Sequence, residues 1–171
     1  MDKKQVIFRD SDFFTINDGK SSHRGIELEF DYAINSDWQL RFAATHAKHR
    51  YESDQQLGDI NIKGNEMDTA PRNIANIQLN WQPSEALNSS LEWHSVGQYF
   101  TDAENLHQYD GHQLLNFRAT WQPTAALNIG LRINNLTDTA YADRADYTSF
   151  SGDRYFPGKP RNLAMTMQYS W

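Results

Sequence analysis

The stretch Ile26-Glu27-Leu28-Glu29-Phe30-Asp31-Tyr32-Ala33-Ile34 decides the fold class of this chain. Apolar side chains stand at every second position, and the residues between them are Glu, Glu, Asp and Ala. Because a β-strand places successive side chains on opposite faces, this stretch predicts a strand with one apolar and one polar face.

The same period of two returns along most of the 171 residues. No segment keeps a helical period long enough to compete with it. We therefore predict an all-β chain that forms an antiparallel meander of about eight strands. The expected strands lie at residues 5–9, 26–34, 38–45, 76–81, 88–100, 115–121, 127–134 and 163–171.

The connections between these strands alternate in length. The pattern W-Q-P-x-x-A-L-N occurs at residues 81–88 and again at 121–128, and each copy marks a short turn between two strands. The other connections are long and polar, at residues 11–23, 52–71, 101–111 and 136–160. Short turns at one end and long loops at the other are typical of an outer-membrane β-barrel.

Tryptophan placement favours a transmembrane β-barrel with its apolar face outward over a soluble barrel with that face inward. Trp38 opens a strand, Trp81 and Trp121 close strands, and Trp171 ends the chain, all at one rim and on the apolar face. Indole rings prefer the membrane–water interface, so these four residues are predicted to form a membrane girdle in contact with outer-membrane lipid. A second girdle is expected at the other rim, from Tyr51, Tyr99, Phe100, Tyr155 and Phe156.

Composition excludes several classes of protein. The net charge is −6, which argues against a nucleic-acid partner because phosphates require a basic face. Cysteine is absent, so there is no disulfide, thiolate metal site or cysteine nucleophile. The mean hydropathy of −0.78 is compatible with a membrane barrel, because only alternate strand residues face lipid and the long loops are polar.

Two motifs near the C-terminus resemble a known family. Asn135-Leu136-Thr137-Asp138, followed by Ala140-Tyr141, resembles the N-L-T-D-x-x-Y motif of TonB-dependent outer-membrane receptors. The ending of the chain resembles the same family, because Phe156-Pro157-Gly158-Lys159-Pro160-Arg161 precedes an alternating strand that ends in Trp171. The resemblance covers essentially the whole chain, in the same order.

The resemblance implies a receptor that imports a ferric siderophore or a similar ligand across the outer membrane of a Gram-negative bacterium. Barrels of this family have about 22 strands around a plug domain, so eight strands match only the C-terminal portion. Residues 1–171 are then one barrel segment, with the plug domain absent and TonB contacted through that missing plug. The family pattern implies no catalytic residue and no cofactor.

The last strand carries the pattern that the barrel-assembly machinery reads in this family. The resemblance assigns this insertion signal to Leu163, Met165, Met167, Tyr169 and Trp171.

The last long loop combines arginine and tyrosine side chains, which suit an anionic, catechol-like ligand. The competing interpretation is a solvated loop with internal ion pairs. The candidate ligand-binding residues are Tyr141, Arg144, Tyr147, Arg154 and Tyr155.

Other clusters of polar residues favour structure over chemistry. The acidic ladder Glu27, Glu29 and Asp31 is expected to pair with arginines such as Arg41 on the polar face, and His46 and His49 fall on opposite faces of one strand. The loop residues Asp102, Glu104, His107, Asp110 and His112 match no known metal-site spacing, so no metal site is predicted.

Two alternatives to the receptor segment remain at this point. The first is a self-closed eight-stranded outer-membrane barrel, whose interior side chains can just fill. The second is a soluble eight-stranded ligand-binding barrel. An enzyme is disfavoured because no nucleophile–base pair is recognisable, and we predict that the chain is not one.

Overall fold

The computed structural model describes residues 2–9, 15–54, 56–57 and 60–171. These residues form fourteen β-strands and their connections. None of the described residues belongs to a helix long and apolar enough to cross a membrane.

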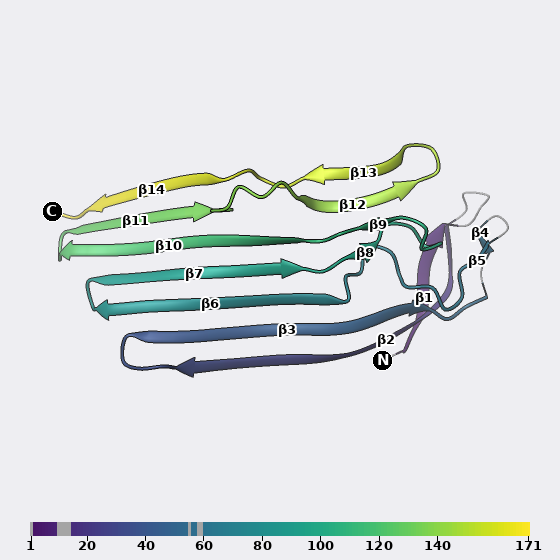
Figure 1. The fold of residues 1–171 in the computed structure, drawn as a ribbon, viewed down its shortest axis with the longest axis horizontal. Helices are drawn as coiled ribbons and strands as arrows, with labels where there is room; N and C mark the ends of the chain where they lie inside the picture. The colour runs from purple at the N-terminus through teal and green to yellow at the C-terminus, as the bar shows by residue number, and fades with distance from the viewer. Residues whose placement is uncertain (1, 10–14, 55, 58–59) are drawn as a thin grey trace.

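Eight strands form one antiparallel sheet in the order β1-β2-β3-β6-β7-β10-β11-β14 (Figure 1). Each strand pairs with the one before it in this order, which confirms the predicted meander. Their bounds are β1 Asp2–Arg9, β2 Thr15–Ala33, β3 Trp38–Tyr51, β6 Asn73–Ser84, β7 Leu87–Val96, β10 His112–Thr124, β11 Leu127–Asn134 and β14 Asn162–Tyr169.

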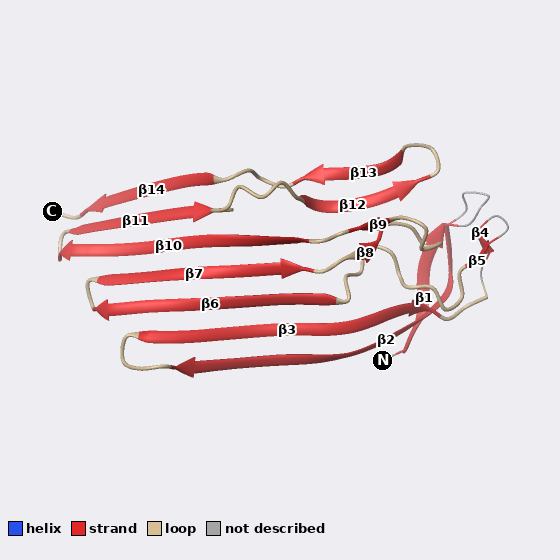
Figure 2. Cartoon of the chain, in the orientation of Figure 1, coloured by secondary structure: helices blue, strands red, loops and turns tan. Residues whose placement is uncertain are grey.

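The long connections contain three further hairpins (Figure 2). These are β4 (Gln56–Leu57) with β5 (Ile60–Asn61), β8 (Tyr99–Phe100) with β9 (Gln108–Tyr109), and β12 (Ala142–Thr148) with β13 (Gly152–Pro157). They all lie at the end of the sheet opposite the short turns. The single strand expected at residues 88–100 is therefore wrong. β7 ends at Val96, and β8 is a separate strand that pairs with β9 within the long connection.

The connection expected at residues 11–23 is also corrected. β2 already begins at Thr15, and residues 10–14 lie outside the described part of the chain. β1 pairs with the N-terminal part of β2, from Asp2↔Ser22 to Arg9↔Thr15. Backbone hydrogen bonds extend the strand here without apolar alternation, which is why the sequence pattern missed it.

The repeated W-Q-P-x-x-A-L-N motif forms the same turn twice. Ser84 pairs with Leu87 and Thr124 pairs with Leu127, each after a register shift that begins at the tryptophan. Proline lacks a backbone N–H, so it fits the irregular position inside each shift. Trp81 consequently lies three residues before the end of its strand rather than closing it, and the same holds for Trp121.

The strand register gathers the apolar side chains on one side of the sheet, here called the apolar face. Trp38 pairs with Trp81 and the rings stack at 5.7 Å, and Phe30 stacks on Phe42 at 5.1 Å. The apolar face comprises residues 26, 28, 30 and 32 of β2, 38, 40, 42 and 44 of β3, 77, 79 and 81 of β6, 91 and 93 of β7, 115, 117, 119 and 121 of β10, 127, 129, 131 and 133 of β11, and 163, 165, 167 and 169 of β14.

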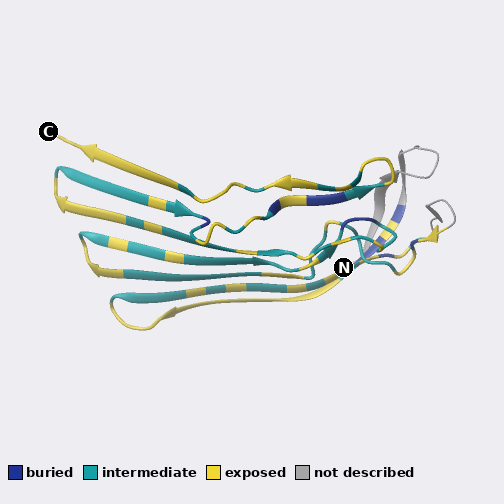
Figure 3. Ribbon diagram, turned by 45° about the horizontal axis from the view of Figure 1, so that its top comes forward, coloured by how far each residue is buried: buried dark blue, intermediate teal, exposed yellow. Residues whose placement is uncertain are grey.

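No packed core covers this face among the described residues. Ile26 is 74% exposed and Met167 is 67% exposed. The buried apolar residues among those described are instead Tyr51, Ile62, Ala142 and Ala145, which lie in or beside the long loops (Figure 3). The described sheet therefore encloses no apolar interior, which argues against the soluble barrel.

The sheet is open. Within the described chain, the edge strand β1 pairs only with β2, and the edge strand β14 pairs only with β11. The self-closed eight-stranded barrel is therefore not what the chain forms. An open sheet with an exposed apolar face is a section of the wall of a larger barrel, because a membrane tolerates no free sheet edge.

Candidate ligand-binding loops

The face of the sheet opposite the apolar face carries a network of polar side chains. Asp31 accepts hydrogen bonds from Gln39 Nε2 at 2.7 Å and from Arg41 Nε at 3.0 Å, which confirms the expected pairing with Arg41 for this member of the acidic ladder. Glu92 accepts from Asn76 at 2.8 Å and from Asn116 at 3.4 Å, so one carboxylate joins three strands. Such a satisfied polar surface is suited to the water-filled or plugged interior of a barrel.

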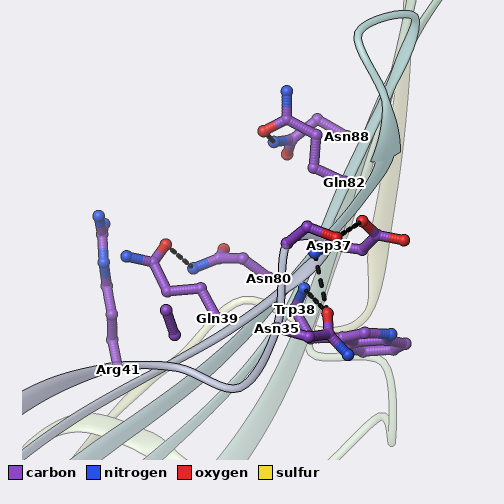
Figure 4. A pocket seen from close by; sticks show the side chains of 10 residues that line it. Asn35, Asp37, Trp38, Gln39, Arg41, Asn80, Gln82 and Asn88 are labelled. Carbon is purple, nitrogen blue, oxygen red and sulfur yellow. Dashed lines mark hydrogen bonds between the residues drawn. The ribbon is translucent and has the colours of Figure 1, made fainter.

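A groove of about 380 Å³ continues this polar face at the short-turn end (Figure 4). Asn35 shapes its floor, because Asn35 Oδ1 accepts from the backbone N–H groups of Asp37 and Trp38 at 2.9 Å each. The amides of Gln39 and Asn80 meet at 3.5 Å on its wall. The groove offers amide donors and acceptors to whatever occupies the interior.

At the opposite end, three long loops form one layer. The first loop connects β3 to β6, the second connects β7 to β10, and the third connects β11 to β14. Thr69 N donates to Phe100 O at 2.8 Å, which joins the first loop to the second. Asn105 bonds both backbone groups of Glu66, each at 2.8 Å, and reinforces that junction. Tyr147 N donates to the Thr101 carbonyl at 2.9 Å and joins the third loop to the second. The loops are thus held together instead of being independent.

Two tyrosines of the second loop fix the β12–β13 hairpin. Ala145 N donates to Tyr99 Oη at 2.9 Å, and Ala142 N donates to Tyr109 Oη at 3.1 Å. Burial raises the pKa of Tyr99 above its ordinary value. Sequence reasoning missed this role of Tyr99. The second-girdle prediction is wrong for Tyr51, which is buried and donates to Asp68 at 2.5 Å.

Arg144 and Arg154 share one carboxylate. Arg144 Nη2 lies 2.5 Å from Asp146 Oδ2, and Arg154 Nε lies 2.6 Å from Asp146 Oδ1. The hydrogen bond from Arg154 holds the pKa of Asp146 below its usual range. The Asp146 side chain is 8% exposed, whereas those of Arg144 and Arg154 are 63% and 41% exposed. The two guanidiniums are therefore accessible while their shared carboxylate is buried, although Asp143 and Asp153 bring the formal charge of the whole hairpin to −1.

The three candidate tyrosines differ in their surroundings. Tyr147 stacks on His107 at 3.6 Å, in the junction between the second and third loops. The ring of Tyr141 packs against Gly158 so closely that an added Cβ would lie 2.1 Å from Tyr141 Cζ. Tyr155 is 57% exposed. The structure therefore gathers all five candidates on or beside one hairpin, with Tyr155 and the two arginines accessible.

The N-L-T-D motif forms the turn from which this third loop departs. Asn135 is buried and has a φ of 51°. Its Oδ1 accepts from Thr139 N at 2.9 Å, while its Nδ2 donates to the carbonyls of Thr139 at 2.9 Å and Lys159 at 3.3 Å. Asp138, at a φ of 56°, accepts from Arg161 N at 2.9 Å. The motif thus joins the beginning of the loop to its end.

The acidic and histidine residues of the second loop bond to different partners. The Asp102 carboxylate accepts from the backbone amides of Leu106 and His107. His107 Nδ1 lies 3.2 Å from Asp153, and His112 bonds Tyr109 at 3.0 Å. No group of three or more His, Asp or Glu residues in the described part of the chain is arranged to hold a metal ion.

The two histidines of β3 lie on opposite faces, as predicted. His46 pairs with Ile26 on the apolar face, and His49 pairs with His23 on the polar face. The Nδ1 atoms of His23 and His49 lie 2.7 Å apart, a contact that the sequence pattern had not indicated.

Comparison with known proteins places this architecture. Residues 1–136 match a family model described as the β-barrel of TonB-dependent receptor-like proteins. The ferric yersiniabactin uptake receptor of Yersinia pestis superposes with a TM-score of 0.82 at 21% identity, over 98% of this chain and 26% of that one. The siderophore receptor PiuA of Acinetobacter baumannii gives 0.79 at 16% identity, over 98% and 24%.

A third similar structure is the ferripyoverdine receptor of the outer membrane of Pseudomonas aeruginosa, with a TM-score of 0.72 at 16% identity, over 98% of this chain and 23% of that one. At these identities the likenesses establish the fold. The chain spans about a quarter of the length of these receptors.

Proposed function

Because the chain belongs to the TonB-dependent receptor β-barrel family, we propose that it is a wall segment of a receptor that imports a ferric siderophore or a similar ferric complex. It is an outer-membrane segment of the Gram-negative type. The family is one of receptors and transporters, not of enzymes. The plug domain, and TonB acting through it, lie outside residues 1–171 in this proposal.

The proposal rests mainly on the sheet itself, which has one apolar face, one polar face and two open edges. The apolar face is exposed on β2 and β14 and half-buried on most of the strands between them, and the opposite face is polar and internally hydrogen bonded. An open sheet with those faces suits a barrel wall with lipid on one side and a polar interior on the other.

We place the girdle of Trp38, Trp81, Trp121 and Trp171 at the membrane interface on the short-turn side. The apolar positions from Ile26 to Ile34 cover eight residue steps, or about 26 Å of strand at roughly 3.3 Å per residue. That length is comparable with the ~25 Å apolar band of outer-membrane barrels. Trp121 is 49% exposed and Trp171 is fully exposed, as side chains bathed by lipid headgroups would be.

We place the ligand at the β12–β13 hairpin. The exposed guanidiniums of Arg144 and Arg154, beside the exposed Tyr155, suit an anionic ferric complex with aromatic or carboxylate groups. Tyr141 and Tyr147, whose rings are packed in the loop layer, contribute to the same site by holding the hairpin in place.

We assign the barrel-insertion signal to β14 and the residues after it. Leu163, Met165, Met167 and Tyr169 all face the apolar side and pair in register with β11, and Trp171 follows the strand. The barrel-assembly machinery is the partner proposed for this strand.

The test is iron uptake in a Gram-negative strain that carries the intact receptor as its only TonB-dependent receptor. Uptake of radioactive iron is measured with ferric citrate, a ferric catecholate and a ferric hydroxamate. At least one complex should enter in a TonB-dependent manner. Equal uptake of all three with and without the receptor gene would refute the transport function.

Charge variants then test the placement of the ligand. Arg144→Gln and Arg154→Gln should each weaken binding of the transported complex about tenfold, as expected for loss of a charge-assisted contact. The matched control is Lys63→Gln, which removes an exposed cation in another loop, paired with Asp54 at 2.9 Å. Weakening by all three variants to the same extent would show a general charge effect and would refute the assignment to this hairpin.

A further inference from the structure

A groove of about 470 Å³ on the apolar side of β2 and β3 carries a concentration of positive charge. Arg24 pairs directly with Lys48, and Arg50 pairs with Ser22 on the same face, two residues further from the short turns. The three cations are exposed. None of them forms an ion pair among the side chains that the structure describes. Glu52, the carboxylate in the groove, accepts a hydrogen bond from Ser22.

The groove lies directly beyond the apolar band. The next pair toward the short turns is Ile26 with His46, followed by Leu28 with Ala44 and Phe30 with Phe42. Arg24 is two residue steps from Ile26, or about 7 Å along the strand. In a bilayer that covers the apolar band, the groove is therefore level with the lipid headgroups on the long-loop side.

The pairs of the neighbouring strands that lie nearest the groove on this side contain no lysine or arginine. Asn73 of β6 pairs with His46, level with Ile26, and Ser95 of β7 pairs with Gln113, level with Leu28. Lysine and arginine on the lipid side of a barrel are costly in the hydrocarbon region and become inexpensive only near the interface. Their concentration on one pair of strands therefore indicates a specific anionic partner at the headgroup level.

We propose that Arg24, Lys48 and Arg50 bind the phosphate groups of a phosphorylated lipid of the outer leaflet. A guanidinium presents paired donors that match two phosphate oxygens, and the ammonium of Lys48 adds a point charge. The acyl chains of the same lipid then lie along Ile26, Leu28 and Phe30 below. The inference rests on the proposed function, since it requires the apolar face to contact lipid.

The experiment measures binding of lipid A to the intact receptor in detergent by native mass spectrometry. The probes are bis-phosphorylated lipid A, the same lipid with both phosphates removed, and inorganic phosphate as a competitor. Each cation near an anionic surface contributes about 1 kcal/mol, so Arg24→Gln/Lys48→Gln should weaken binding of the phosphorylated lipid roughly 30-fold. The matched control is Arg118→Gln/Arg132→Gln, a directly paired and exposed basic pair on the polar face, which should bind like wild type.

Three results would overturn the inference: unchanged binding in the Arg24→Gln/Lys48→Gln variant, equal binding of the dephosphorylated lipid, or displacement by millimolar inorganic phosphate, which would indicate a free-anion site. Tryptophan fluorescence of the wild type in brominated lipid separates these results from failure of the proposed function. Quenching would show that the apolar face contacts lipid. In that case, failure of the lipid-phosphate site alone would not affect the proposal that the chain is a barrel wall. Absence of quenching would refute both.

Discussion

Replacing Asn135 by alanine should loosen the third loop while leaving the main sheet intact. The side chain makes three hydrogen bonds, to Thr139 N, Thr139 O and Lys159 O. Because the residue is 2% exposed, water cannot replace these partners fully. At about 1 kcal/mol net for each bond, their loss costs roughly 3 kcal/mol. Alanine at a φ of 51° adds about 1 kcal/mol of backbone strain.

The assay is amide hydrogen exchange of the intact receptor in detergent, read at β12 (Ala142–Thr148) and β13 (Gly152–Pro157). A loss of about 4 kcal/mol corresponds to roughly a thousandfold faster exchange in this hairpin. Asn135→Gly removes the same hydrogen bonds without the strain, so it should show roughly a hundredfold increase. Asn128→Ala, in β11, is the matched control and should change exchange little.

Two results would refute this reasoning. If Asn135→Ala and Asn135→Gly both exchange within about threefold of wild type, the turn does not anchor the loop. If exchange rises equally in the strands of the main sheet, the motif stabilises the barrel as a whole, and its local role is wrong.

Two other changes test the same loop. Gly158→Ala should raise hydrogen exchange in the hairpin at least tenfold, because the new Cβ would lie 2.1 Å from Tyr141 Cζ. Adding Tyr141→Ala should relieve the clash and reverse most of the effect. Additive effects of the two substitutions would contradict this contact. Lowering the pH should destabilise the hairpin through Asp146: its pKa is depressed in the folded loop by Arg154, so the stabilisation is complete above the ordinary carboxyl pKa of about 4 and is lost as the pH falls below it. Hairpin exchange followed from pH 6 to 3, with the intrinsic rate corrected, should show this loss in wild type and not in Asp146→Asn; identical profiles would show that Asp146 does not contribute.

Several features of this protein followed from residue order alone. Alternation over residues 26–34 and its counterparts identified the strands and the two faces, because side-chain direction in a strand depends only on local backbone geometry. The repeated turns at Pro83 and Pro123 were recognisable for the same reason, since a short turn is encoded by adjacent residues. The motif at residues 135–138 identified the family through its residues, although the hydrogen bonds that explain it were not visible.

The arrangement of the loops required the tertiary structure. Polar loop residues carry no periodicity, so the sequence could not show that Tyr99 supports Ala145, that Asp146 holds both Arg144 and Arg154, or that Asn135 reaches Lys159. These contacts join positions between 8 and 46 residues apart, except that Arg144 and Asp146 are only two residues apart. The extension of β2 to Thr15 depended on β1 in the same way. Local geometry determines which side of a strand a residue faces, whereas only the folded chain determines which distant residue completes its hydrogen bonds.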